Sequence, residues 1–133
     1  MTSEAKLTLT KTRDLSEKTA QTTGMRRLVA VSEEANGSRG LWAGYVTMPP
    51  GAKSGAHHHG DAESVIYMLA GRARFRWGDQ LENTTDAEPG DFVFVPPGLV
   101  HQEINALDDT SVECIVVRDR PRDMVVNVEV AEA

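Results

Sequence analysis

The sequence predicts an all-β fold, a small β-barrel, and two observations support this prediction. Short apolar runs rich in β-branched and aromatic residues recur along the chain, separated by Gly, Pro, Asn or Asp residues. No window shows a sustained amphipathic helical period. Many short strands between turns of this kind are typical of β-sandwiches and barrels. The 133 residues are most simply one domain with one core.

The predicted strands follow a polar, threonine-rich arm that covers residues 1–25, so we expect the barrel domain to cover residues 26–133. In one strand Ala73, Phe75 and Trp77 share a face while arginines occupy the other, which predicts one buried side. The expected strands cover residues 26–32, 41–48, 64–70, 72–77, 91–95, 99–105, 111–117 and 124–130. The aromatic candidates for the core are Tyr45, Tyr67, Phe75, Trp77, Phe92 and Phe94.

Composition and charge exclude several functions. Twenty acidic against fourteen basic residues give a formal net charge of −6, which argues against nucleic acid as a partner. No apolar run approaches the ~20 residues of a membrane span, and the first residues lack the pattern of a secretory signal. The single cysteine, Cys114, lies in an apolar strand where we expect it to be buried and inert. It excludes an intrachain disulfide, and we expect a cytoplasmic location.

Two segments bounded by glycines carry the chemistry. The first runs from Gly51 to Gly71 and contains His57 and His59, which lie on the same face of an extended chain because side chains alternate. The second begins at Gly90 and contains His101. Imidazole nitrogens bind divalent transition metals, so a fold that brings the two segments together would form a metal site.

Both segments resemble the two motifs of the cupin superfamily. The second motif matches at every position, and the first matches at its glycines and its paired histidines. The resemblance implies a double-stranded β-helix barrel that holds one divalent transition metal (Fe, Mn, Ni, Cu or Zn) in its mouth. The matching residues are Gly51, His57, His59, Gly71, Gly90, Pro96, Gly98, His101 and Asn105. Asn105 is expected to bond loop backbone near the end of its strand.

The acidic ligand of the first motif is displaced by one residue. Glu63 lies one position before the place that the motif gives to its glutamate, where this chain has Ser64. A slip of one residue sends a side chain to the opposite face of a strand, unless a bulge turns it back. We expect His57, His59, His101 and Glu63 to be the metal ligands. Otherwise the site has three histidines, or Glu103, two residues after His101, contributes a carboxylate.

The predicted function is that of a metal-binding cupin acting on a small molecule. A dioxygenase-type reaction is slightly favoured over an isomerase or lyase reaction, with Glu103 as the candidate catalytic acid or base. The alternative is a non-catalytic module that binds or senses a small ligand. No catalytic triad, phosphate loop or dinucleotide fingerprint accompanies the histidines. We also expect a homodimer formed through edge strands, since an exposed edge invites pairing.

Overall fold

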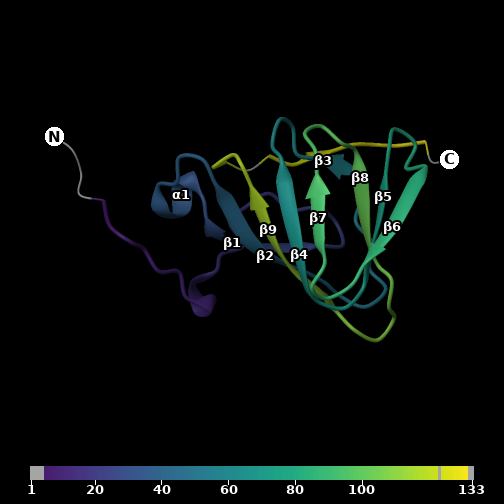
Figure 1. Cartoon of the computed structure of the whole chain (residues 1–133), viewed down its shortest axis with the longest axis horizontal. Helices are drawn as coiled ribbons and strands as arrows, with labels where there is room; N and C mark the ends of the chain where they lie inside the picture. Colours follow the sequence, from purple (N-terminus) through teal and green to yellow (C-terminus); the bar gives the residue numbers. More distant parts are fainter. Residues whose placement is uncertain (1–4, 123, 132–133) are drawn as a thin grey trace.

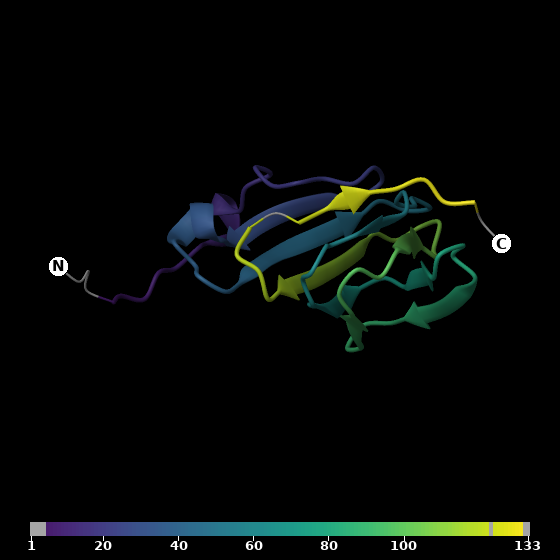
Figure 2. The same cartoon turned by 90° about the horizontal axis from the view of Figure 1, so that it is seen from above.

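The computed structural model describes residues 5–122 and 124–131, which form two antiparallel five-stranded sheets (Figures 1 and 2). The first sheet has the strand order β1-β2-β9-β4-β7 and the second the order β10-β3-β8-β5-β6. The strands are β1 (Arg26–Val31), β2 (Trp42–Met48), β3 (His57–His58), β4 (Ser64–Ala70), β5 (Ala73–Trp77), β6 (Asn83–Ala87), β7 (Phe92–Val95), β8 (His101–Asn105), β9 (Val112–Arg118) and β10 (Val126–Asn127). This arrangement confirms the all-β, double-stranded β-helix prediction.

The hydrophobic core lies between the two sheets. Strands β2 and β9 pair along their whole length, from Trp42 opposite Arg118 to Met48 opposite Val112, and both alternate strictly between buried and half-buried positions. The second sheet contributes Phe75 and neighbouring residues of β5 to the same cluster. Cys114 belongs to this cluster, and burial raises the pKa of its thiol, as expected for an inert core cysteine.

Two glycines fix turns that shape the barrel. Gly71 joins β4 to β5 with a positive φ of 80°, and a Cβ atom there would lie 2.6 Å from the backbone oxygen of Ser111. Gly60 ends the histidine segment with a φ of 56°, and its carbonyl oxygen accepts a hydrogen bond from the Gly98 nitrogen at 2.7 Å. Only glycine adopts such conformations without strain, so both turns depend on the residue type.

The arm before β1 is mostly irregular. It contains one 3-10 turn, η1 (Thr12–Asp14), and one bridge in which Ser16 pairs with Val29. Leu7 and Leu9 are 91% and 74% exposed. Figure 1 shows the arm leaving the barrel on the side of β1. The first strand begins at Arg26, where the sequence places the start of the barrel domain.

Several features differ from expectation. Of the aromatic core candidates only Phe75 belongs to the core cluster; Tyr45, Tyr67 and Trp77 are half-buried, and Phe92 and Phe94 are 72% and 59% exposed on β7, where Val95 is the buried residue.

Strand β6 forms where no strand was expected. A single-turn helix, α1 (Glu33–Asn36), also follows β1 where no helix was expected; Ser32 caps its start and Gly37 ends it in the left-handed conformation. Among the described residues, no helix has the length and apolar character needed to cross a membrane.

Candidate metal centre

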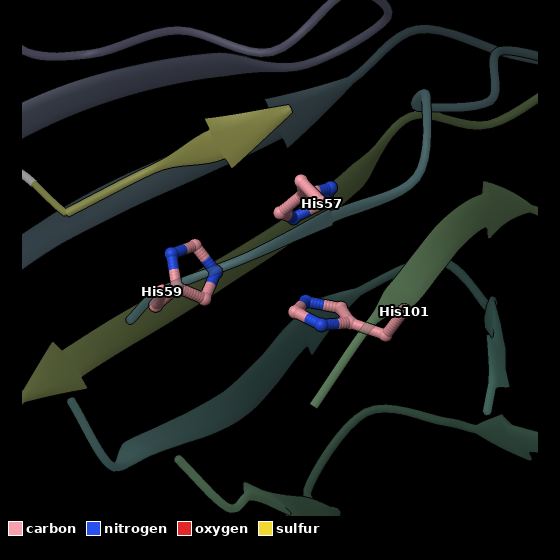
Figure 3. Close-up of side chains that lie close together, drawn as sticks. All are labelled: His57, His59 and His101. Carbon is pink, nitrogen blue, oxygen red and sulfur yellow. The ribbon is translucent and has the colours of Figure 1, made fainter. Parts of the chain in front are cut away.

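Three histidines from the two glycine-bounded segments meet inside the barrel (Figure 3). One ring nitrogen from each of His57, His59 and His101 lies within 4.8 Å of those of the other two. The ring centroids are 4.3 Å apart for His57 and His101, 5.1 Å for His57 and His59, and 5.3 Å for His59 and His101. All three residues are buried. The structure therefore joins the two motifs into one site.

Strand register explains why the histidines meet. His57 of β3 lies directly opposite His101 of β8, and Trp77 of β5 lies opposite His101 on the other side. His59 follows His57 by two residues and so returns to the same face, just before the turn at Gly60. Strands thus hold His57 and His101, whose side chains would lose little conformational freedom when an ion binds.

Backbone carbonyl groups fix the tautomer of each ring. In every case Nδ1 lies at hydrogen-bonding distance from a carbonyl oxygen, which can only accept, so Nδ1 carries the proton. The Nε2 lone pairs are then left for a metal, the arrangement that supports histidine ligands in metalloproteins. The pairs are His57 with Gly55 (3.0 Å), His59 with Met124 (2.8 Å) and His101 with Leu99 (3.0 Å).

The surroundings keep two of the imidazoles neutral. The pKa of His101 is lowered to about 4, mainly by burial, while the charge of Glu103 opposes the shift and the charges of His57 and Arg27 add to it. Burial likewise lowers the pKa of His59 to about 2, with a further contribution from the Arg118 guanidinium. Since metal and proton compete for the same lone pair, rings that are neutral at pH 7 are suited to bind an ion.

Glu103 places a buried carboxylate beside the histidines. Its Oε2 atom lies 3.4 Å from Nε2 of His57 and 3.9 Å from Nε2 of His101. Burial raises the pKa of Glu103, but the imidazoles of His57 and His101 and the guanidinium of Arg27 lower it more, so the carboxyl is ionised at neutral pH. Arg27 itself is 1% exposed, and its Nη2 atom lies 3.5 Å from Nε2 of His57.

These atoms fit a metal ion. With its proton on Nδ1, His57 presents a lone pair at Nε2 only 3.4 Å from an ionised oxygen of Glu103. Two acceptors at this distance are stabilised by positive charge, which the Arg27 guanidinium supplies at 3.5 Å from Nε2 of His57 and to which a metal ion would add. Nε2 of His101 is buried and has no hydrogen-bond partner among the described residues. Three imidazoles with a neighbouring carboxylate form a donor set typical of divalent transition metals.

The structure does not bring Glu63 to this cluster. The Glu63 side chain is exposed, and its backbone nitrogen donates to Oδ1 of Asp119 at 2.8 Å. Ser64 takes the inward position and is 2% exposed. No bulge turns Glu63 back, so the period-two alternation decides which side chain faces the barrel interior. His58 also lies outside the cluster, and its Nδ1 accepts a hydrogen bond from the Gly60 nitrogen.

Sequence reasoning missed two arginines that lie near the histidines. Arg27 and Arg118 are each 1% exposed. Arg118 continues the inward series of β9 that begins with Val112 and Cys114, and Arg27 shares the inward face of β1 with Val29. A charged residue at an inward position of an apolar strand is the signal that could have identified both.

A largely apolar cavity of about 340 Å³ reaches the cluster at His101. It lies between strands of both sheets, and its lining is mainly aromatic and aliphatic. Pockets of this size and character are typical of small-molecule sites. The lining residues are Phe75, Trp77, Thr85, Val93, Phe94, Val95, Pro96, Leu99 and His101.

Comparisons with known proteins assign the family. A sequence model of the cupin domain matches residues 44–118, more than half of the chain. The chain therefore belongs to the cupin domain family, which confirms the resemblance seen in the two histidine motifs. A search of curated protein sequences found no significant match.

Solved structures of the same fold include polyketide cyclase RemF from Streptomyces resistomycificus, with a TM-score of 0.74 and 19% identity over 96% of this chain and 89% of that chain. Oxalate decarboxylase from Bacillus subtilis matches with a TM-score of 0.70 and 22% identity over 81% of this chain. The formate complex of the Lactobacillus farciminis enzyme matches with a TM-score of 0.71 and 19% identity over 87% of this chain. The chain spans 28% and 34% of these two decarboxylase chains. At such identities the similarity establishes the fold.

Proposed function

We propose that this cupin is a metal-dependent enzyme that acts on a small molecule. His57, His59 and His101 would hold one divalent transition metal, and the observation that carries the proposal is that one ring nitrogen from each of them lies within 4.8 Å of those of the other two. The chemistry supplied by such an ion is Lewis acidity and, for a redox-active metal, electron transfer to dioxygen. A substrate in the cavity lined by Trp77 and Leu99 would lie next to His101.

The chain's own residues supply the remaining functions. Glu103 lies beside the imidazoles of His57 and His101, where an ionised carboxylate can accept a proton from a bound substrate or bind the metal itself. The apolar lining of the cavity excludes water and so strengthens electrostatic interactions at the centre. Glu63, with its exposed side chain, has no part in this proposal.

Metal analysis of the full chain, purified without a histidine tag, tests the site. We expect about one equivalent of metal, and we expect His57→Ala, His59→Ala and His101→Ala each to lose most of it. His58→Ala is the matched control, because His58 precedes His59 directly but lies outside the cluster. Full metal content in all three cluster variants would contradict the proposal.

Activity assays distinguish between the possible types of reaction. Oxygen uptake after reconstitution with Fe(II), across thiols, diols and aromatic diols, tests the dioxygenase type of reaction. Product analysis with Zn(II) or Mn(II) under nitrogen tests the isomerase or lyase type. Ligand binding without turnover under any of these conditions would instead favour the alternative, a non-catalytic module that binds or senses a small ligand.

The chain is also proposed to form a homodimer. Large apolar side chains are exposed on the outer face of β4 and on β7, which is an edge strand of the first sheet. Exposed apolar surface of this kind is typical of association sites. These residues are Val65, Leu69, Phe92 and Phe94, with exposed fractions of 41%, 45%, 72% and 59%.

A further inference from the structure

The cavity that reaches His101 opens at the edge of the barrel. Its buried lining residues include Phe75, Val95 and His101, whereas Thr85 of β6 and Phe94 of β7 line it and are exposed. Strands β6 and β7 are the last strands of the two sheets, so the cavity opens between two sheet edges. A molecule that enters there passes exposed side chains first and then reaches His101.

Aromatic rings line this cavity from both sheets. Phe75 and Trp77 belong to β5 of the second sheet, and Phe94 belongs to β7 of the first sheet. The chain has three Phe, two Trp and two Tyr residues, so three of its seven aromatic side chains meet at this one cavity. Aromatic rings gain most from other rings, stacked or edge to face. The lining therefore favours a planar aromatic molecule over a saturated one.

The volume of the cavity sets the size of that molecule. An apolar protein cavity of about 150 Å³ holds one benzene molecule. The cavity of about 340 Å³ is roughly twice as large, so it has room for about two fused rings. A single ring would leave about half of the space unfilled.

Uncharged side chains surround this space. Among the described residues that line the cavity, none is Asp, Glu, Lys or Arg, and the polar side-chain atoms belong to Thr85, Trp77 and His101. A charged group that leaves water for such a lining finds no charged partner. Its transfer therefore costs far more free energy than that of a neutral hydroxyl or carbonyl group. The cavity is suited to an uncharged molecule.

We infer that the cavity takes a neutral aromatic molecule of about two rings, which enters between β6 and β7 and presents one polar group to His101. This inference rests on the proposed metal-dependent function and names its substrate class. The rings lie against Phe75, Trp77 and Phe94, and the polar group at the buried end is the part that would face the metal centre. An acid or an amine of the same shape lacks a charged partner in this lining.

Calorimetric binding measurements on the full chain test the inference. The probe is naphthalene-2,6-diol, compared with naphthalene-2,6-dicarboxylate and with 2,6-bis(aminomethyl)naphthalene in its ammonium form. Each molecule carries the same group at both ends, so either orientation brings one such group to the buried end. In the metal-free protein, where a carboxylate cannot bind the ion instead, we expect the diol to bind at least about tenfold more tightly than either charged compound.

Two further ligands test size and flatness. Hydroquinone has the same hydroxyl groups on one ring, and decalin-2,6-diol has them on two saturated rings. Each should bind about tenfold more weakly than naphthalene-2,6-diol, because the first buries less apolar surface and the second makes no ring contacts. The zinc-loaded protein should bind naphthalene-2,6-diol at least as tightly as the metal-free protein does.

Trp77 variants locate the bound rings. Trp77→Leu should weaken binding of naphthalene-2,6-diol about three- to tenfold, whereas Trp77→Phe should keep most of the affinity. In Trp77→Phe the change in tryptophan fluorescence on binding should disappear, because the remaining Trp42 is not part of this lining. Tyr45→Leu is the matched control, since Tyr45 is a half-buried aromatic residue outside the cavity. If Trp77→Leu does not fold, the fluorescence of Trp77→Phe decides.

The outcomes separate the two proposals because zinc content is measured in the same samples. Equal affinities for the diol and the dicarboxylate, or a zinc-loaded protein that prefers the dicarboxylate, would overturn the neutral substrate class even if zinc binds. A fluorescence change that persists in Trp77→Phe would place the rings elsewhere and overturn it too. Preference for the diol in a chain that binds no zinc would support the cavity assignment and overturn the metal centre.

Discussion

The carboxylate of Glu103 lies 3.4 Å from Nε2 of His57, and both groups are shielded from solvent inside the barrel. The proton of His57 is on Nδ1, where the Gly55 carbonyl oxygen accepts it at 3.0 Å. The lone pair of Nε2 and the anionic oxygen of Glu103 therefore face a common space. This relationship supports the proposed metal centre, in which Glu103 would supply the carboxylate that was expected from Glu63.

Replacing Glu103 with glutamine should weaken metal binding. The substitution keeps the size of the side chain but removes a negative charge next to two of the proposed histidine ligands, and losses of this kind are typically about 10–100-fold in affinity. Competition with a chromophoric chelator measures the change. Glu113→Gln, at a half-buried outward position of β9, is the control and should bind like wild type. Unchanged affinity in Glu103→Gln would mean that the carboxylate neither binds the ion nor stabilises its charge.

The metal-free protein should lose stability as the pH falls from about 6.5 towards 4. In the folded state burial lowers the pKa of His101 from 6.5 to about 4, so the unfolded chain binds the proton more readily than the folded one. The contribution of this group is complete above pH 6.5 and is lost as the pH falls through that window, at up to ~1.4 kcal/mol per pH unit. His59 adds a slope of the same sign, because its pKa is also lowered, to about 2.

Chemical denaturation of the apo protein at a series of pH values measures this slope. His101→Asn should make it clearly shallower between pH 6.5 and 4, because one of the two groups that take up a proton is gone while His59 remains. His58→Asn is the control, since it removes a histidine outside the cluster. An apo protein whose free energy of unfolding is constant across this window would contradict the prediction.

Asn105 should be important for stability rather than for chemistry. Its side-chain nitrogen donates to the carbonyl oxygens of Met48, Pro49 and Thr110 at 3.3, 3.1 and 2.8 Å, and its Oδ1 accepts from the Leu107 nitrogen at 2.9 Å. Asn105→Ala leaves several backbone groups without a partner, which should lower the free energy of unfolding by about 2–4 kcal/mol. Thermal melting measures the loss, with Asn127→Ala at an exposed position as the control. A melting temperature equal to that of wild type would show that water replaces the side chain.

The second motif could be predicted in full because spacing alone specifies it. Its glycines, proline and asparagine form a turn and a strand end, and the strand register then places His101 opposite His57. The first motif could not, because a displacement of one residue changes the face on which an acidic side chain lies. Sequence alone left open whether a bulge turns Glu63 inward, and the structure has Ser64 there instead.

Contacts between residues far apart in the sequence could not be predicted from any local sequence pattern. The carbonyl oxygen of Met124 fixes the tautomer of His59 from 65 residues away, and the short strand β10 that follows pairs with β3. The aromatic residues of β7 show that residue type alone does not predict burial. Phe92 and Phe94 were predicted to be core residues by type, yet Val95 is buried while both phenylalanines are mostly exposed, Phe94 also lining the cavity. The hydrophobic pattern predicted the strand, but it did not predict which of the two faces of the strand is buried.

The outward phenylalanines lead to a prediction about assembly. The ring of the exposed Phe92 lies against that of the half-buried Tyr67 on the neighbouring strand, with centroids 4.6 Å apart, at the edge of the first sheet. Two copies related by a twofold axis can cover this surface mutually, because each offers the same apolar patch. We expect analytical ultracentrifugation to give twice the chain mass of 14.5 kDa for wild type.

The double variant Phe92→Ser/Phe94→Ser should then shift the mass to that of a single chain while retaining the β-sheet circular dichroism spectrum, since neither side chain belongs to the core. Leu41→Ser is the matched control, because Leu41 is 51% exposed but lies outside the strands of this patch, before β2. A dimer that survives the double variant would place the interface elsewhere. If the wild-type protein instead sediments with the mass of one chain at high concentration, the homodimer prediction is wrong. The patch would then be free to bind a different partner.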